Sequence, residues 1–460
     1  MMKIKNRDRL ISVGDIEARR IVLDIIELSL QSLDVYHTLR NLLNLDGNIL
    51  KIGDLRWDLE QKRRLLVIGA GKACNSMAKA VEETFGDRIT EGVVIVKEIN
   101  PGDKLKRIEL VVGGHPLPNQ GGLLGSEKIL NLVEQASSED LFVSVISGGS
   151  SALMSCPVSG ISLEDEIKLT DLLLKSSARI VEINAVRRHI SAMNGGRLAQ
   201  RIEAKGAEMI NLIISDTVGD RPTNDPSQPT EFYGTPVAGD RTTLQDARNV
   251  LRKYHLISRA PRSIVEFLRT EDHGRETPNF FGSRIHHFVL QRPADACEAA
   301  KKAASNIGLT GSVLTTLLEG ESREAGTFLA TVAKEIALNH RPFVPPCVLI
   351  AGGEMTTRVD GIPGQGGPSQ ELALSFALEI SGMAGFSIAA IDTDGTDGPT
   401  EIAGGIADGS TVERARLKGL DVYERLMAHD SSTILKILGD EIITGNTGTN
   451  VCDLNVIYIS

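Results

Sequence analysis

Short apolar runs that end in glycine-rich, polar segments recur along most of the chain. One run, RRLLVIG, leads into residues 69–72, Gly-Ala-Gly-Lys, and another, DLFVSVI, leads into residues 147–151, Ser-Gly-Gly-Ser-Ser. Helix-like stretches such as ACNSMAKAVEETF separate these runs. Apolar, β-branched strands that alternate with helices are typical of a parallel sheet covered on both faces. The sequence therefore predicts an α/β fold, in which ligands bind beyond the carboxyl ends of the strands.

The length of the chain favours more than one domain, because 460 residues exceed what one hydrophobic core usually holds. A mixed, charged segment over residues 246–288 interrupts the alternation of strands and helices. We therefore predict an N-terminal domain over residues 1–245 and a C-terminal α/β region over residues 246–460. Near the start of the chain, the apolar spacing predicts one long amphipathic helix over residues 15–43.

The net charge and the cysteines indicate which kinds of partner the protein binds and in which cellular compartment it works. The formal net charge is −10, which repels a phosphate polymer, so we expect no nucleic-acid partner. The five cysteines are widely spaced, which fits reduced thiols in the cytoplasm and indicates no thiol metal site. The apolar N-terminal stretch contains Asp24 and Glu27 at helical spacing, which argues against a signal peptide or membrane span. The oligomeric state stays open, with a homodimer as one option.

The Gly-Ala-Gly-Lys loop is the first candidate for anion binding. Glycines such as Gly71 let backbone N–H groups approach an anion, the following helix adds its positive end, and Lys72 adds a mobile charge. The loop is not a Walker A motif, and Cys74 stands where a dinucleotide fingerprint has its third glycine. A tight turn with a solvent-facing lysine is the structural alternative.

The serine-rich loop is the second candidate, because it offers backbone donors and hydroxyl groups without a charge. This composition suits a phosphate cradle, and an ordinary serine-rich loop is the alternative. The residues concerned are Ser147, Gly148, Gly149, Ser150 and Ser151.

A predicted helix carries Arg187, Arg188 and His189 in succession. An arginine at this position suits bidentate hydrogen bonding to a carboxylate. For either arginine taken alone, an ion pair on the protein surface is an equal alternative. The histidine is more often a packed residue than a catalytic base.

Two acidic loops follow predicted strands. Asp216 and Asp220 flank one strand tip, where they suit Mg²⁺ or the proton of a hydroxyl group, although turn capping is an equal alternative. Asp392, Asp394 and Asp397 share a second loop, where their charges repel one another unless a cation compensates. A Mg²⁺ ion that bridges nucleotide phosphates fits this second loop. Further polar groups in the second half of the chain are Glu354 and the segment 447–453, which includes Asn450.

Together these segments resemble the glycerate 2-kinase family, whose C-terminal part is called the MOFRL domain. The matching segments lie between residues 64 and 454, in order: VIGAGKA, GGHPLPN, VISGGSSALM, NAVRRHISAMNGGRLA, ISDTVGD, GGE, GQGGPSQELAL, DTDGTDGPT and GNTGTNVCDL.

The resemblance implies a Rossmann-like N-terminal domain with a mostly parallel sheet. It also implies a smaller α/β MOFRL domain over about residues 345–455, with the active site in the cleft between the two domains. The implied reaction is Mg²⁺-assisted phosphoryl transfer from ATP to D-glycerate, which forms 2-phosphoglycerate. The lysine that the family uses in its GAGKA loop falls on Lys72. Many members carry an arginine where this chain has Pro368, so its contact is absent or comes from a residue such as Arg187 or Arg358.

The expected site combines these loops. Lys72 is predicted to be catalytic, with Asp216 or Asp220 orienting the attacking hydroxyl, and the metal is assigned to Asp392, Asp394 and Asp397. The groups expected to bind substrate or phosphate are Gly71, Ser147, Gly148, Gly149, Ser150, Ser151, Arg187, Glu354, Gln370 and Asn450.

Two other functions compete with a kinase. A hydroxypyruvate reductase using NAD(P)H is one, because GAGKAC is close to a nucleotide fingerprint and Glu98 ends the next predicted strand. The missing third glycine and the acidic loops argue against it. A non-catalytic regulator that binds a sugar phosphate is the other, and it would not need the acidic loop at 392–397.

Overall fold

The computed structural model describes residues 2–99, 102–176, 178–219, 235–270, 273–279, 282–359, 361 and 364–460. The described residues divide into two compact units. The parallel-sheet unit comprises Val35–Ser215 and Asp220–Leu290, and the mixed-sheet unit comprises Met1–Asp34, Asp216–Gly219 and Gln291–Ser460. The chain thus starts and ends in the mixed-sheet unit, and Asp216–Gly219 also belongs to that unit.

The parallel-sheet unit is built on a sheet in the strand order β6-β5-β4-β7-β8-β9. These strands are β4 (Arg64–Ala70), β5 (Ile89–Val96), β6 (Ile108–Val112), β7 (Asp140–Ile146), β8 (Glu208–Ile214) and β9 (Ile285–Gln291). Strands β4 to β8 pair in parallel. The chain runs outward from β4 to β6 and then crosses to β7 on the other side of β4, which is the strand order of a Rossmann fold. The predicted Rossmann-like parallel sheet is confirmed.

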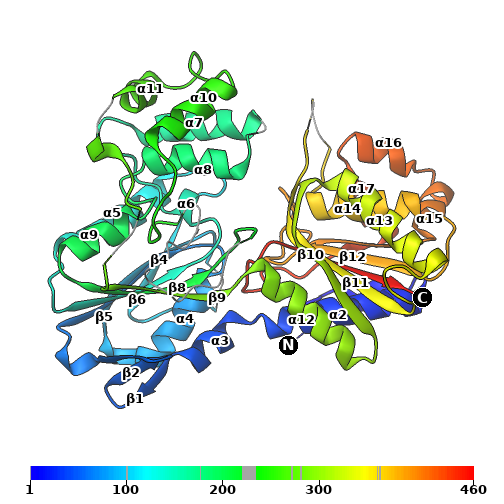
Figure 1. Ribbon diagram of the computed structural model, residues 1–460, viewed down its shortest axis with the longest axis horizontal. Coiled ribbons are helices and arrows are strands. Elements are labelled where there is room, and N and C mark those ends of the chain that lie inside the picture. The colour runs from blue at the N-terminus through cyan, green and yellow to red at the C-terminus, as the bar shows by residue number, and fades with distance from the viewer. Residues whose placement is uncertain are drawn as a thin grey trace. The chain divides into compact units, whose positions relative to one another are not determined.

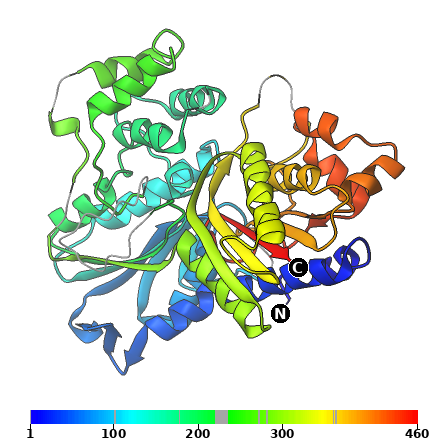
Figure 2. The same ribbon diagram turned by 45° about the vertical axis from the view of Figure 1, so that its right-hand side comes forward.

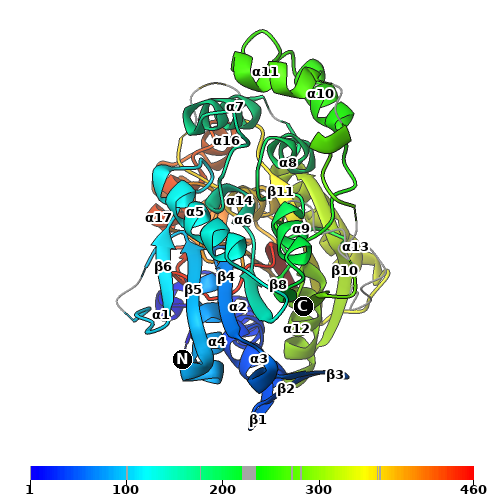
Figure 3. The same cartoon turned by 90° about the vertical axis from the view of Figure 1, so that its left-hand side faces the viewer.

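Helices cover both faces of this sheet (Figures 1 and 3). Helices α5 (Gln120–Glu134) and α9 (Arg197–Ala204) pack on one face, where Ile129 and Leu198 join a core with Phe142 of β7. Helices α3 (Val35–Leu42) and α4 (Cys74–Phe85) lie on the other face. Because the strands are buried from both sides, their apolar residues run continuously instead of alternating.

Further elements of this unit lie away from the sheet. A separate core, with Val186 and Leu251 among its residues, joins α7 (Leu163–Lys175), α8 (Ile180–His189), α10 (Leu244–Lys253) and α11 (Arg262–Arg269). A small antiparallel sheet that the sequence did not reveal contains β1 (Asn44–Asp46), β2 (Ile49–Ile52) and β3 (Leu55–Asp58). The indole N–H of Trp57 ties it to the main sheet by donating to Glu208 at 2.6 Å.

The mixed-sheet unit is built on a sheet in the order β10-β11-β15-β12-β13-β14. Its strands are β10 (Thr310–Glu321), β11 (Cys347–Thr356), β12 (Phe386–Asp392), β13 (Gly404–Asp408), β14 (Glu441–Ile442) and β15 (Asp453–Ile459). Strands β10 and β11 are parallel, and the other neighbours are antiparallel.

Helices cover both faces of the mixed sheet as well (Figures 1 and 2). Helices α2 (Ile16–Ser32) and α12 (Pro293–Asn306) cover one face. The other face carries α13 (Ser322–Asn339), α14 (Pro368–Glu379), α15 (Thr411–Leu417), α16 (Val422–Met427) and α17 (Ser431–Leu438). Helix α14 lies between the sheet and its neighbouring helices and is buried nearly all round. The predicted second α/β domain is confirmed.

The two units do not coincide with the predicted division after residue 245. The helix expected over residues 15–43 is two helices, α2 and α3, and they belong to different units. At the other end, β9 joins the parallel sheet and extends that unit to Leu290. Both differences arise from pairing between segments that are far apart in the sequence.

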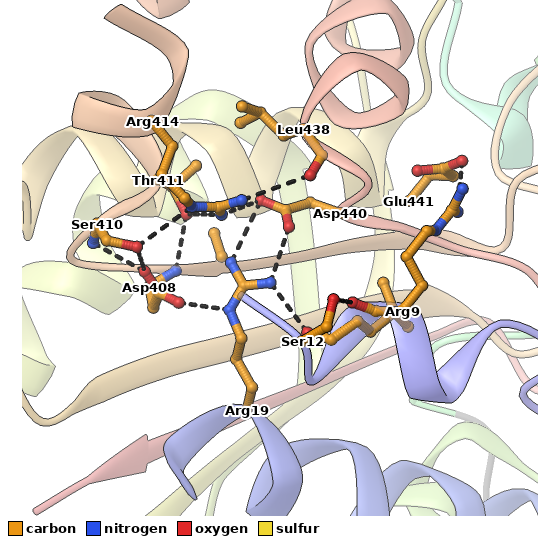
Figure 4. A network of polar contacts seen from close by, with 12 residues as sticks. Arg9, Ser12, Arg19, Asp408, Ser410, Thr411, Arg414, Leu438, Asp440 and Glu441 are labelled. Carbon is orange, nitrogen blue, oxygen red and sulfur yellow. Dashed lines mark hydrogen bonds and ion pairs between the residues drawn. The ribbon is translucent and has the colours of Figure 1, made fainter. Parts of the chain in front are cut away.

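A buried network of charges attaches helix α2 to the mixed sheet (Figure 4). The fully buried guanidinium of Arg19 donates through Nε to Asp408 and through Nη1 and Nη2 to Asp440, the latter at 2.7 and 3.2 Å. Arg414 of α15 also donates to Asp440, and Ser410 donates to Asp408 through its N–H and hydroxyl at 2.7 and 2.6 Å. Burial opposes the charge of Arg19, but the two carboxylates outweigh it and raise the pKa of Arg19.

In the described part of the chain, no helix is long and apolar enough to cross a membrane.

Because Arg19 is the centre of this network, we expect its removal to lower the stability of the fold strongly. Arg19→Met should lower the free energy of unfolding by about 3–5 kcal/mol, because it leaves the buried carboxylates of Asp408 and Asp440 poorly compensated. Arg20→Met is the matched control, since Arg20 is exposed on the same helix and pairs with exposed Glu17. Urea unfolding measures both. Equal stability of the two variants would contradict the proposed role of the network.

Candidate functional site

Two of the predicted anion-binding loops lie side by side in the parallel-sheet unit. Strands β4 and β7 are parallel neighbours, with Ala70 opposite Ile146, so the loops that follow them start from adjacent positions. The N–H of Lys72 donates to the carbonyl of Gly148 at 2.9 Å, and the N–H of Ala73 donates to Ser147 Oγ at 3.0 Å. This is where the strand order reverses, the usual ligand crevice of such sheets.

Close contacts explain the glycines of these loops. A Cβ atom on Gly71 would lie 2.0 Å from Ser147 Oγ, so no other residue fits between the loops. Gly149 has a φ of +84°, and a Cβ there would lie 3.0 Å from His115 Cδ2 and 3.3 Å from Lys72 Cγ. The imidazole of His115 and the stem of Lys72 therefore lie against the same glycine.

His115 is a candidate that sequence reasoning missed. It follows β6, and its segment GGHPLPN was used only for the family resemblance. The available signal was its position beyond the carboxyl end of a parallel strand, where the ligand crevice was expected.

The serines of the second loop differ in their surroundings. The hydroxyl of Ser147 is buried, accepts from Ala73 and lies 3.5 Å from Cys74 Sγ, so it holds the two loops together. Ser150 and Ser151 begin the short helix α6 (Ser150–Leu153).

Helix α8 brings Arg187 toward the same region. Arg187 Nη2 donates to the carbonyl of Pro116, next to His115, at 3.1 Å. Burial lowers the pKa of Arg187 to about 10, against the opposing charge of Glu166. Its Nε has no hydrogen-bond partner among the described residues. Arg187 is thus buried, charged and incompletely paired, as a carboxylate-binding arginine would be before its ligand arrives.

The two residues after Arg187 are structural. Arg188 forms an ion pair with Asp240 at 2.6 Å. His189 Nδ1 lies 2.8 Å from the carbonyl of Ala185, and its Nε2 lies 3.3 Å from Glu276. The interpretation of His189 as a packed residue agrees with this position.

The acidic loop after β12 is held by local turns. Asp392 accepts from the N–H of Asp394 at 3.1 Å, and Asp394 accepts from the N–H and hydroxyl of Thr396 at 2.7 and 2.8 Å. Such turns are what short acidic side chains form in loops.

Asp397 differs from the other two aspartates, because it caps helix α14. Its oxygens accept from the N–H groups of Ser369 and Gln370 at 3.0 and 2.9 Å and from the side-chain amide of Gln370 at 3.0 Å. Burial raises the pKa of Asp397 to about 7, although these hydrogen bonds favour its charged form. Among the described residues, no group of three or more acidic, histidine or cysteine side chains is arranged to hold a metal ion. Asp397 is thus engaged as a helix cap, and the assignment of a metal ion to Asp392, Asp394 and Asp397 stays a prediction.

Gln370 is also engaged inside the fold. Its side chain is fully buried, donates to Asp397 and Thr400 and accepts from the hydroxyl of Ser432 at 2.5 Å. Both N–H groups of its amide are used in these bonds, and a contact of Gln370 with substrate stays a prediction.

Other predicted acidic residues lie around Cys452 of the mixed-sheet unit. The thiol of Cys452 donates to the backbone carbonyl of Asp216 at 2.8 Å. Burial raises the pKa of this thiol, and it is raised further by the charges of Glu354, Asp216, Asp453 and Asp392. Asn450 is buried two residues earlier. Asp220 lies outside the described residues.

Comparison with known proteins gives a consistent family. A model described as a domain of unknown function, DUF4147, matches residues 21–269, and the model of the MOFRL family matches residues 347–453. Over 447 residues the chain is 39% identical to the glycerate 2-kinase of Pyrococcus horikoshii, with 96% of this chain and 98% of that protein covered. It is 36% identical over 398 residues to an Agrobacterium vitis protein named "Putative hydroxypyruvate reductase", with 86% of this chain and 87% of that protein covered.

A solved structure supports the same grouping. The crystal structure of glycerate kinase from Thermotoga maritima matches with a TM-score of 0.77 and 36% identity, covering 96% of this chain and 99% of that one.

The contacts of Gly149 predict a loss of anion binding when a methyl group is added there. Gly149→Ala should weaken binding of inorganic phosphate at least about tenfold, or about 1.4 kcal/mol, because the methyl group displaces His115 and Lys72. Gly160→Ala is the matched control, since Gly160 has a φ of +91° but nothing within 4 Å of its added Cβ.

Both variants should lose about 1–2 kcal/mol of stability from the left-handed backbone alone. Calorimetric titration with phosphate, beside thermal melts, separates the two effects. Equal phosphate affinity in both variants would show that the contacts of Gly149 do not shape an anion site.

Proposed function

The chain belongs to the glycerate 2-kinase family with a C-terminal MOFRL domain, and from this we propose that it transfers a phosphoryl group from ATP to D-glycerate. The product is 2-phosphoglycerate. The observation that carries the proposal is the meeting of the Lys72 and Ser147 loops at the point where the strand order reverses. The loops supply positive charge and backbone donors without a strong base, and phosphoryl transfer relies mainly on positioning and electrostatics.

Lys72 and His115 are the proposed contacts of the phosphoryl group. Both lie against Gly149, so one oxygen-bearing group can meet both side chains. A fixed ammonium group stabilises negative charge that develops on the transferred group, and it needs no reorganisation during the reaction.

Arg187 is the proposed anchor of the glycerate carboxylate. Its unpartnered Nε and its positive charge suit a carboxylate, and Nη2 is already fixed by Pro116. An anchored carboxylate places the neighbouring C2 hydroxyl closer to the transfer site than the C3 hydroxyl, which favours the 2-phosphate.

Mg²⁺ fits the oxygen donors of the mixed-sheet unit. Mg²⁺ is commonly held by one or two carboxylates together with substrate phosphates, so Asp392 and Asp394 suffice as protein ligands. A bound ion would offset the charge of the nucleotide phosphates. Asp216 and Asp220 remain the proposed groups for orienting the attacking hydroxyl, and a site with contributions from both units stays a prediction.

The competing reductase activity is tested beside the kinase activity. We expect ADP release that depends on D-glycerate, and no NADH or NADPH oxidation with hydroxypyruvate. Coupling through enolase alone, without phosphoglycerate mutase, should give a signal, because enolase uses 2-phosphoglycerate directly. NADH or NADPH oxidation without glycerate-dependent ADP release would replace the kinase with the reductase.

Lys72 is expected to be essential for turnover. Lys72→Met should lower kcat by about 100-fold or more, the cost of removing a fixed donor from a developing charge, and leave the protein folded. Lys79→Met, at an exposed position of helix α4, should keep wild-type turnover. Steady-state kinetics and circular dichroism check both variants, and near-normal kcat in the Lys72 variant would remove this residue from the mechanism.

Asp394 and Asp397 are expected to differ in their effect on metal dependence. Asp394→Asn should raise the Mg²⁺ concentration for half-maximal activity about tenfold, as changes at metal sites commonly do. Asp397→Ala should leave this concentration unchanged and lower stability by about 1–2 kcal/mol, because α14 loses its cap. Mg²⁺ titrations beside thermal melts measure both, and a lower melting temperature with unchanged Mg²⁺ dependence in the Asp394 variant would assign it a structural role alone.

A further inference from the structure

Asn184 and Arg187 of helix α8 each carry a buried polar atom that lacks a partner in the described part of the chain. Asn184 Oδ1 and Arg187 Nε have no hydrogen-bond partner among the described residues, and their side chains are only 8% and 5% exposed. Buried polar atoms are nearly always paired, because leaving one unpaired is costly. Two such atoms within one helical turn indicate that the fold keeps a place for a polar ligand.

The two side chains share one face of the helix. Residues three apart on a helix are neighbours, with Cβ atoms about 5–6 Å apart. The bond from Arg187 to the carbonyl of Pro116 directs this face to the loop that carries His115, which in turn lies against Gly149. Arg187 is therefore directed to the region of the Lys72 loop, and Asn184 lies one helical turn away from it on the same face.

The other faces of α8 are occupied by the fold itself. Ile183 and Val186 belong to the apolar core of the helical cluster. Glu182 accepts from Lys253 and Tyr254 at 2.6 Å each. The faces of α8 with Glu182, Ile183 and Val186 are thus used by the fold itself.

The chemistry of the pair selects the ligand. A guanidinium group donates hydrogen bonds to a carboxylate, whereas an amide oxygen accepts a hydrogen bond from a hydroxyl or N–H group. We propose that Asn184 accepts the C3 hydroxyl of D-glycerate while Arg187 holds its carboxylate, which leaves the C2 hydroxyl between them for transfer. This inference rests on the proposed glycerate kinase activity and makes Asn184 a specificity-determining residue.

The arrangement discriminates against acids that lack the C3 hydroxyl. D-Lactate has a methyl group in its place, and its binding would leave the amide oxygen of Asn184 buried and unpaired. Sites built to bind a substrate hydroxyl reject the analogue without it strongly, because the polar group of the site stays unsatisfied.

The test compares D-glycerate with D-lactate in matched variants. Asn184→Leu keeps a similar side-chain volume and removes the hydrogen bond, and Asn184→Ala provides a second variant if the first does not fold. Asn131→Leu places the same change at an exposed position of helix α5. The quantities measured are the KM of D-glycerate and the inhibition constant of D-lactate in the ADP-release assay.

In the wild type, the inhibition constant of D-lactate should exceed the KM of D-glycerate at least about tenfold, the effect of 1.4 kcal/mol. In Asn184→Leu this ratio should fall about tenfold, because the KM rises while the inhibition constant stays or decreases. The Asn131 variant should keep the wild-type ratio.

Two outcomes overturn the inference and can be told apart. A ratio unchanged by Asn184→Leu, including a parallel rise of both constants, would assign Asn184 a purely structural role while leaving the kinase activity in place. A wild-type protein that releases no ADP with D-glycerate would overturn the proposed function and this inference with it.

Discussion

The buried ion pairs of Arg19 with Asp408 and Asp440 connect the two ends of the chain within the mixed-sheet unit. They join helix α2, near the start of the sequence, to Asp408 and Asp440, which follow 389 and 421 residues later. Helix α2 then covers strands β12 and β15, whose ends carry Asp392 and Asp453. The network thus attaches α2 to the sheet in which strand β12 ends at Asp392, the first residue of the loop proposed for Mg²⁺. A buried ion pair is costly to form, and it specifies one arrangement because any other leaves its charges unpaired.

The parts of this structure that could be predicted from sequence are those with local causes. The apolar runs and the glycines after them predicted a parallel sheet and the loops at its strand ends, and the family resemblance added that the sheet is Rossmann-like. Gly71 and Gly149 are required there by close contacts. The division into units was missed, because α2 and β9 pair with segments far away in the sequence. The role of Asp397 was missed for the same reason: its partners, Ser369 and Gln370, belong to a helix that precedes it in the chain. The sequence suggested that the carboxylates of Asp392, Asp394 and Asp397 are equivalent, whereas in the structure Asp397 caps helix α14.

Pro368 shows how a departure from the family pattern is accommodated. It begins helix α14, where proline is favoured because the first N–H of a helix has no partner within it. The next two N–H groups are satisfied by Asp397. The position therefore serves the start of a helix, and we propose that Lys72 and Arg187 of the parallel-sheet unit supply the positive charge for substrate binding.

The central claim is transfer of a phosphoryl group to the C2 hydroxyl of D-glycerate, and the proton-coupled ³¹P NMR spectrum of the product tests it most directly. A phosphate on C2 is coupled to a single proton on that carbon, so the account predicts that the new monoester resonance is a doublet. A triplet would place the phosphate on C3, where two protons couple to it, and would contradict the assigned anchoring by Arg187. A spectrum in which ATP remains unchanged after incubation with D-glycerate and Mg²⁺ would contradict the kinase assignment itself.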